Sequence, residues 1–256
     1  MIKQLLVLLL IFSTLNSKEN YTLDYGIGIA YINIPQYIGA KNTLQYTLPY
    51  PYLYYSSKKV TIEKNRLFKH IYNSKRIKID MSFSGTVPVK SDEESLRYGM
   101  KDLDLTLEAG PNFIYKYIRV KNINIDFNLP IRGAFKIGNS IDNIGYLYNP
   151  NISFKYYKYK FEFEAQIGAS YANDNYYNYF YEVKSKDVTS SRYEYSSKGG
   201  FGGYKSSIGF SYLTKHMFYG GFIRYYDLKN AVFKDSSLVN SNHAIFVAFK
   251  IGYIFN

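Results

Sequence analysis

The chain has 256 residues and a formal net charge of +12, with 32 Lys and Arg against 20 Asp and Glu. It contains no Cys, which excludes disulfides, Cys-ligated metals and thiol catalysis. Aromatic residues make up 19% of the chain, with 31 Tyr and 18 Phe, and because aromatic side chains fit pleated surfaces this composition favours an all-β fold.

The N-terminal segment has the pattern of an export signal. Lys3 precedes a continuous apolar run over residues 5–12, and Ser17 offers a small residue before polar Lys18. The run is too short to span a bilayer but has the length of a signal-peptide core. The alternative is a buried strand or helix of a cytosolic domain. We predict a cleaved signal peptide over residues 1–17 and a single domain over residues 18–256, exported in a Gram-negative cell.

Six later segments alternate apolar and mixed residues. In the clearest, apolar Ile123, Ile125 and Phe127 are separated by Asn124 and Asp126. Strand side chains have a period of two, so each segment presents one apolar and one mixed face. Segments of about ten residues, tilted near 45°, cross the roughly 25 Å apolar band of an outer membrane. The sequence therefore predicts a transmembrane antiparallel up-and-down β-barrel, with strands over residues 23–31, 77–84, 103–113, 122–131, 159–170 and 245–255.

A soluble lipocalin-like barrel would also alternate, with its apolar face inward. The mixed faces, however, carry Gly, Ser, Asn and charges of both signs, which suit a polar lumen, and Tyr residues gather near strand ends as in the aromatic girdles of membrane barrels. We therefore favour the membrane barrel and expect a solvated polar network in its lumen. Its members are Asp24, Asp80, Asp104, Glu108, Asp126, Glu162, Glu164, Lys78, Lys116 and Lys155.

The connections set the expected number of strands. Short ones are predicted at 56–58, 73–75, 117–121, 156–158 and 214–216, and long ones at 35–43, 88–101, 132–143, 173–203 and 228–241. With both termini in the periplasm the strand count is even and the short turns are periplasmic. Residues 58–73 give about twelve strands if they form two short strands with a tight turn near Asn65, and about ten if they form one.

The last strand has an aromatic and apolar outer face ending close to the C-terminus. We predict that it carries the signal read by the barrel-assembly machinery, formed by Phe249, Ile251, Tyr253 and Phe255.

Six segments, in this order, resemble the MipA/OmpV family of outer-membrane proteins. They are Gly26–Tyr31, Pro35–Gly39, Leu48–Tyr52, Tyr171–Tyr176 followed by Tyr179 and Phe180, Asp235–Val239, and Gly252–Phe255. Two features depart from the family pattern, because Val60–Tyr72 lacks the usual glycines and Asn256 follows the expected terminal Phe. The resemblance implies a structural or scaffolding protein that docks a periplasmic murein hydrolase or synthase, while relatives are linked to adhesion and antibiotic susceptibility.

Candidate catalytic residues are few. The histidines are His70, His216 and His243, and Ser241 with His243 is the one pair that suggests a lipase-like dyad. No metal-ligand spacing, phosphate-binding glycine loop or nucleic-acid motif is present, so we expect no cofactor, no nucleic-acid partner and no enzymatic activity. The alternatives to a scaffold are a small-solute pore, a surface adhesin and, least favoured, a lipid or lipopolysaccharide hydrolase.

The positive charge suggests contact with outer-membrane lipid, lipopolysaccharide or peptidoglycan through long-range attraction. The competing interpretation is a set of solvated basic loops without a specific partner. The spread of lysines over both ends of one hairpin pair, from Lys58 to Arg76, favours this second interpretation.

Overall fold

The computed structural model describes residues 22–56, 60–63, 66–69, 71–92 and 95–255. The predicted signal peptide and His70 lie outside these residues. Between β11 and β12 the described chain forms helix α2 (Asp174–Tyr181) and the 3-10 turn η1 (Ser185–Asp187). The strands are β1 (Thr22–Pro35), β2 (Thr43–Ser56), β3 (Val60–Glu63), β4 (Arg66–Lys69), β5 (Tyr72–Asn73), β6 (Ile77–Thr86), β7 (Leu105–Val120), β8 (Ile123–Ile137), β9 (Ile141–Tyr148), β10 (Asn151–Lys158), β11 (Phe161–Ala172), β12 (Gly200–Leu213), β13 (Met217–Asp227) and β14 (His243–Phe255).

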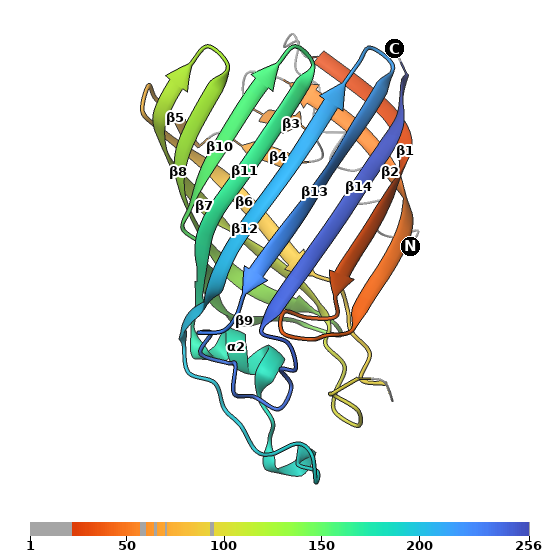
Figure 1. Ribbon diagram of the computed structural model, residues 1–256, viewed down its shortest axis with the longest axis vertical. Helices are drawn as coiled ribbons and strands as arrows, with labels where there is room; N and C mark the ends of the chain where they lie inside the picture. The colour runs from red at the N-terminus through yellow and green to blue at the C-terminus, as the bar shows by residue number, and fades with distance from the viewer. Residues whose placement is uncertain (1–21, 57–59, 64–65, 70, 93–94, 256) are drawn as a thin grey trace.

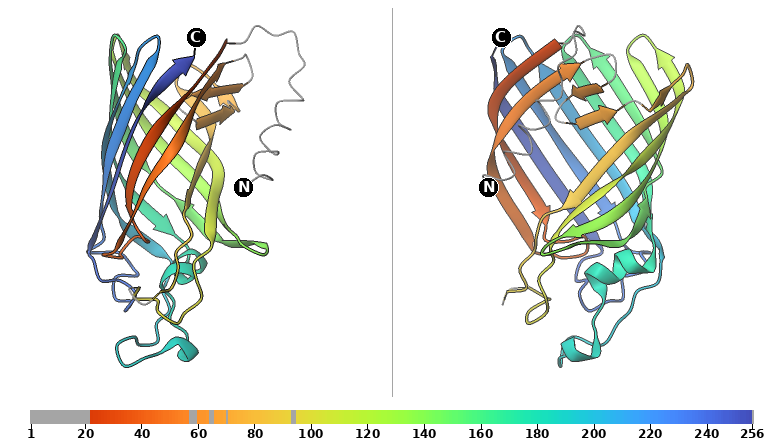
Figure 2. Two further views of the ribbon diagram at one scale, coloured as in Figure 1. Left: turned by 90° about the vertical axis from the view of Figure 1, so that its right-hand side faces the viewer. Right: turned by 180° about the vertical axis from the view of Figure 1, so that it is seen from behind.

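The strands form a barrel of antiparallel neighbours (Figures 1 and 2). The first and last strands pair from Tyr25 opposite Phe255 to Asn33 opposite Val247, which joins the two ends of the chain. Two of the twelve strands are interrupted. Segments β4 and β5 follow one another along the chain and make one strand, and segments β9 and β10, which both pair with β8, make another. The fourteen strand segments of the described chain thus make twelve strands, which confirms the predicted fold class and the larger count.

Proline explains the interruption between β9 and β10. Asn149 and Pro150 lie between the two segments, and Pro150 has no backbone N–H to give to a neighbouring strand. On either side of the break, Tyr148 lies opposite Ile131 and Asn151 lies opposite Asn128, so β8 runs past it unbroken.

The connections separate by length. The described turns at 74–76, 121–122, 159–160 and 214–216 lie at the end of the barrel that holds the C-terminus, and the long loops and α2 lie at the other end (Figure 1). The long loop predicted over 132–143 is wrong, because β8 continues to Ile137 and β9 begins at Ile141. Gly138, Asn139 and Ser140 make a tight hairpin there, and the flanking small and polar residues belong to the strands.

The apolar faces of the strands lie on the outside of the barrel. Ile27 and Ile29 are 56% and 57% exposed, whereas Ala30 on the inner face is 8% exposed. A soluble barrel would bury these side chains, since exposed apolar patches of this extent need an apolar environment. The same holds on other strands, including Phe127, Leu129, Ile131, Ile167, Ile208, Ile223 and Ile245. Phe249, Ile251, Tyr253 and Phe255, the predicted assembly signal, share this outer face and are 39–46% exposed.

Small residues allow the seam between β1 and β14 to pack closely. Gly28 lies opposite Gly252, and a Cβ atom at Gly28 would lie 2.8 Å from the Cζ atom of Phe218. Phe218 is therefore seated over a glycine pair, and its ring stacks on Tyr52 with 4.9 Å between centroids. Only glycine leaves space for this ring on the inner face of the seam.

Candidate functional site

A folded cap closes the barrel at the loop end. Helix α2 contributes Tyr177, Phe180 and Tyr181 to a buried apolar cluster that also contains residues of the loops and of the inner faces of the strands. The cluster includes residues of four loops, which connect β1 to β2, β6 to β7, β11 to β12 and β13 to β14, so its side chains pack across the mouth of the barrel at this level. The remaining members are Tyr37, Ala40, Val89, Leu103, Ala134, Ile144, Leu147, Ala172, Tyr226, Leu228, Ala231, Phe233 and Ala244.

Hydrogen bonds lock three distant loops of the cap together. The Tyr37 hydroxyl donates to the Leu238 carbonyl at 2.8 Å, and the Tyr181 hydroxyl donates to the Ile38 carbonyl at 2.8 Å. The Ser236 hydroxyl donates to the Tyr181 carbonyl, also at 2.8 Å. These three loops contain three of the segments whose residues carry the family resemblance. The bonded residues are separated by 55, 143 and 201 positions along the chain, so distant segments meet in one structural unit.

A fourth loop is fastened to the cap by buried arginines. Arg97, which is 5% exposed, donates from Nη1 to the Phe180 carbonyl at 2.9 Å. Arg192 donates from Nη1 to the carbonyls of Leu96 and Tyr98 at 2.9 and 3.0 Å. Main-chain carbonyls thus accept hydrogen bonds from both guanidinium groups, and the loop over residues 95–98 is held against the end of α2.

Burial alters the acidity of the cap tyrosines. Loss of solvation raises the pKa of Tyr37 to about 12, although the nearby Arg97 charge lowers it somewhat. Burial raises the pKa of Tyr181 well above its usual range. Burial also lowers the pKa of the Arg97 guanidinium, because its positive charge is poorly solvated there. These phenols are hydrogen-bond donors within the cap and stay protonated at neutral pH.

A chain of polar contacts connects α2 to the barrel wall. The Tyr176 hydroxyl donates to Glu108 Oε1 at 2.9 Å, and Glu108 Oε2 lies 3.1 Å from Arg132 Nη1. Arg132 also donates to the Asn149 side chain, and Asn149 Nδ2 donates to Ser170 Oγ at 3.0 Å. The side chains of Glu108 and Arg132 are only 6% and 8% exposed, so this ion pair is buried beneath the cap. Sequence reasoning named Glu108 but missed Arg132, which fell in a predicted loop.

Five of the other predicted lumen residues form separate ion pairs, and the remaining four lie elsewhere on the inner face, in the cap or at the rim. Lys78 Nζ lies 2.8 Å from Asp80, Lys155 Nζ lies 3.8 Å from Glu164, and Asp126 pairs with Arg119. The Lys116 ammonium donates to the Ser74 carbonyl at 2.7 Å, at the short-turn rim. Asp104 precedes β7 and its backbone N–H donates to the Tyr179 hydroxyl at 2.8 Å in the cap. Glu162 lines the lumen cavity described next, and Asp24 lies on the inner face of β1.

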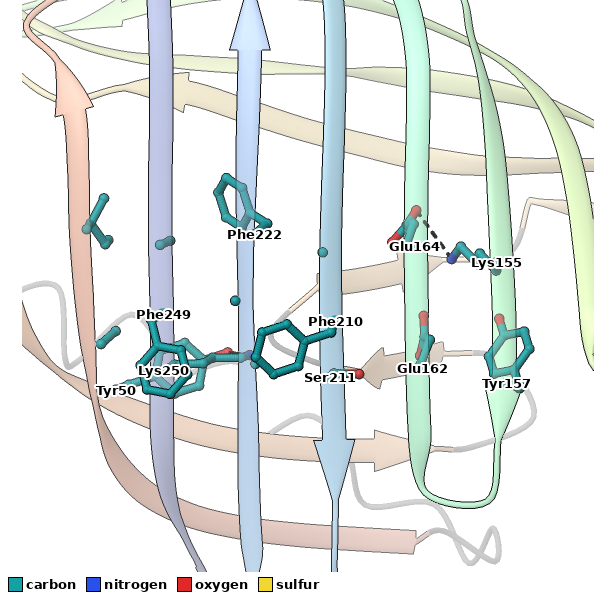
Figure 3. Close-up of a pocket in the computed structure, with 16 residues that line it drawn as sticks. Tyr50, Lys155, Tyr157, Glu162, Glu164, Phe210, Ser211, Phe222, Phe249 and Lys250 are labelled. Carbon is teal, nitrogen blue, oxygen red and sulfur yellow. Dashed lines mark hydrogen bonds and ion pairs between the residues drawn. The ribbon is translucent and has the colours of Figure 1, made fainter.

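A cavity of about 420 Å³ lies in the lumen, on the short-turn side of the cap (Figure 3). Tyr50 and Lys250 line it from one side, and Lys155, Glu162 and Glu164 line it from the opposite side, with the ion pair drawn in Figure 3. The Lys250 ammonium donates to the Tyr50 hydroxyl at 2.5 Å. Glycines of β12 and β13 (Gly209, Gly220 and Gly221) border the cavity, so it lies where the wall carries few side chains.

Ser241 and His243 do not form the lipase-like dyad that stood as the least favoured alternative. The Ser241 hydroxyl donates to the main-chain carbonyl of His243 at 2.6 Å, whereas the His243 ring Nδ1 lies 3.1 Å from Asn242 Oδ1. His216 lies in the turn between β12 and β13 and stacks on Tyr253 with 5.8 Å between ring centroids. Neither of the described histidines is therefore hydrogen-bonded through its ring to the Ser241 hydroxyl, as a dyad would require.

Two features are absent from the described residues. These residues contain no group of three or more His, Cys, Asp or Glu placed to hold a metal ion. No helix among them has the length and apolar character needed to cross a membrane.

The exposed apolar outer face, the polar lumen and the pairing of β1 with β14 define an outer-membrane β-barrel protein. The family model described as MltA-interacting protein MipA matches residues 27–255. The chain therefore belongs to the MipA family, which confirms the resemblance found in the sequence.

Among solved structures, similar folds include the outer membrane protein OprG from Pseudomonas aeruginosa, with 11% identity, a TM-score of 0.26, and coverage of 93% of this chain and 98% of OprG. The toluene transporter TodX of Pseudomonas putida shows 9% identity and a TM-score of 0.31, covering 93% and 89% of the two chains. A FadL homologue of Pseudomonas aeruginosa shows 6% identity and a TM-score of 0.33, covering 93% and 90%. The search of curated proteins gave no match.

Proposed function

We propose that this outer-membrane barrel is a non-enzymatic scaffold that docks a murein-processing enzyme at its periplasmic end. The observation that carries the proposal is the interlocked cap, in which Tyr181 and Phe233 stack with 4.0 Å between ring centroids. A mouth filled by such packing is unsuited to the passage of solutes. The name of the family, MltA-interacting protein, supports a partner of this class.

The short-turn end offers the surface for docking. Barrels of this class place their short turns in the periplasm, where murein enzymes act. The tip residue Tyr159 is 99% exposed there, whereas Tyr193 in the loop between β11 and β12 is 56% exposed at the opposite end. These two tyrosines therefore report on the two ends of the same barrel.

Photo-crosslinking in cells tests the docking. A photoreactive phenylalanine analogue replaces Tyr159 in one strain and Tyr193 in a matched control strain. We expect a lytic transglycosylase or a peptidoglycan synthase to crosslink to the barrel from position 159 and not from position 193. Failure of both enzymes to crosslink from position 159, or equal crosslinking from both positions, would remove the proposal.

The lumen cavity favours a second candidate, a small-solute pore. Its charged lining, with Lys155 and Glu164 on one wall and Lys250 on the other, resembles the polar interior of a channel. Planar-bilayer recordings of the purified protein separate the two functions. A scaffold with an intact cap gives no stepwise conductance, while reproducible steps that grow when the cap is loosened would establish the pore.

A further inference from the structure

The two ends of the barrel carry different charge. The described loops at the capped end contain ten Lys and Arg and eight Asp and Glu, within residues 36–42, 87–92, 95–104, 138–140, 173–199 and 228–242. The four described turns at the opposite end contain no Asp or Glu and five basic residues, which are Lys75, Arg76, Lys121, Lys160 and Lys215. We call these five residues the basic rim. The excess positive charge is thus concentrated at the short-turn end.

The basic rim is available to a partner. All five of its side chains are exposed, and none forms an ion pair with another described residue. The lumen pairs, by contrast, neutralise their own charges. Unpaired cations on several turns around one rim produce a positive field that attracts an extended anion and holds it at several points.

An unusual tyrosine lies within the rim. Tyr159, at the tip of the turn between β10 and β11, has φ +53° and is 99% exposed. A left-handed conformation is costly for a residue with a Cβ atom, and Asn or Gly normally occupies such two-residue turns. The ring gains no packing in return, and it lies between Lys158 and Lys160. Backbone strain kept at an exposed aromatic residue indicates a binding role.

We propose that the basic rim and Tyr159 bind the peptidoglycan polymer directly. Its peptide carboxylates pair with the ammonium and guanidinium groups, and a sugar ring stacks on the Tyr159 face. Lipopolysaccharide lies in the outer leaflet, at the capped end where the charges of the described loops nearly balance, so it does not meet the rim. Anionic phospholipid would use the charges of the rim but would leave the Tyr159 ring, which extends from the turn tip, without a stacking partner. This binding is independent of the docking of an enzyme.

Sedimentation with isolated sacculi tests the proposal, using full-length protein in zwitterionic detergent and no enzyme. The rim variant replaces three lysines with glutamine (K121Q/K160Q/K215Q). The matched control removes the same charge from exposed loop lysines at the capped end (K186Q/K229Q/K234Q). We expect the rim variant to bind sacculi about tenfold more weakly, the order expected for losing three exposed charge contacts, and the control to bind like the wild type. Added salt should weaken the wild type more than the rim variant.

The aromatic contribution is tested separately with Tyr159→Asn. Asn tolerates the left-handed conformation, so this variant keeps the turn while removing the ring. We expect weaker sacculus binding with the salt dependence of the wild type. Binding unchanged from that of the wild type would remove Tyr159 from the site.

Other outcomes would overturn the whole proposal. Wild-type protein that stays in the supernatant, or equal losses in the rim and control variants, would do so. Sacculi with amidated carboxylates should lose binding, and their unchanged binding would contradict charge recognition. Vesicles of phosphatidylcholine, with and without phosphatidylglycerol, test the lipid: rim-dependent binding to anionic vesicles without binding to sacculi would assign the rim to the membrane instead.

Discussion

Replacement of Arg132 by Met should destabilise the barrel by leaving a buried carboxylate without its cation. Glu108 and Arg132 are 6% and 8% exposed, and the loss of one partner of a buried pair costs about 3–5 kcal/mol. Glu108 still accepts the Tyr176 hydroxyl at 2.9 Å in this variant. One remaining hydrogen bond offsets part of the loss, so we expect about 2–4 kcal/mol.

Urea unfolding in detergent micelles, followed by far-ultraviolet circular dichroism, measures this change. The control is Lys136→Met on the same strand, since Lys136 lies 3.0 Å from Asp142 in an exposed pair whose side chains are 25% and 48% accessible. Exposed pairs contribute at most about 1 kcal/mol, so the control should lie close to the wild type. The double variant Glu108→Gln, Arg132→Met removes the buried charge altogether and should regain most of the lost stability.

The reasoning fails if Arg132→Met and Lys136→Met change the free energy of unfolding equally. It also fails if the double variant is less stable than Arg132→Met alone, because the cost would then come from lost packing and not from an uncompensated charge.

Three further predictions concern the cap and the short-turn rim. Phe233 is 1% exposed and stacks on Tyr181, so Phe233→Ala should destabilise the cap by about 3–5 kcal/mol. The variant should speed proteolysis of residues 173–199 while the strands stay paired. Unchanged cleavage would contradict the packing argument. Burial raises the pKa of Tyr37 to about 12 from 10.0. The free energy that the protonated Tyr37 phenol adds to folding is therefore fully present below pH 10. It is lost as pH rises towards 12, by about 3 kcal/mol in all. Tyr37→Phe should flatten this alkaline loss when the free energy of unfolding is measured from about pH 9 to 12. Tyr159→Asn should raise the free energy of unfolding by about 1 kcal/mol in urea titrations because Asn accepts a left-handed backbone, and a loss of stability would show that the ring contributes to the fold.

The strands were predictable because every second residue of a membrane strand faces lipid and is therefore apolar. Runs such as Ile123–Ile131 need an apolar face towards hydrocarbon and a mixed face towards the lumen, and local sequence shows both. The twelve-strand count depended on residues 58–73, and the presence of β3 and β4 on either side of Asn65 agrees with the two-strand interpretation. The boundary errors have local causes, as at 132–143, where small and polar residues within strands have the composition of a loop.

The candidate site was less predictable, because its residues come from distant parts of the chain. The alternation of the sequence placed Glu108 and the lumen lysines on the mixed face of the strands. No spacing rule, however, connects Glu108 to Arg132 or to Tyr176 on a helix. The Asn173 side chain, which accepts from the Tyr176 N–H at 3.3 Å and caps α2, was the one local signal for that helix within a predicted loop.

The sequence by itself determined the barrel, its polar inner face and the family, because period-two alternation and strand-end aromatics are local consequences of placing a sheet in a membrane. Tertiary structure alone decided that the long loops fold into a cap, that charges pair as they do in the lumen, and that the basic turns gather at one rim. These features depend on which strands become neighbours when β1 meets β14, and closure of the barrel sets those distances in space, whatever the separation along the chain.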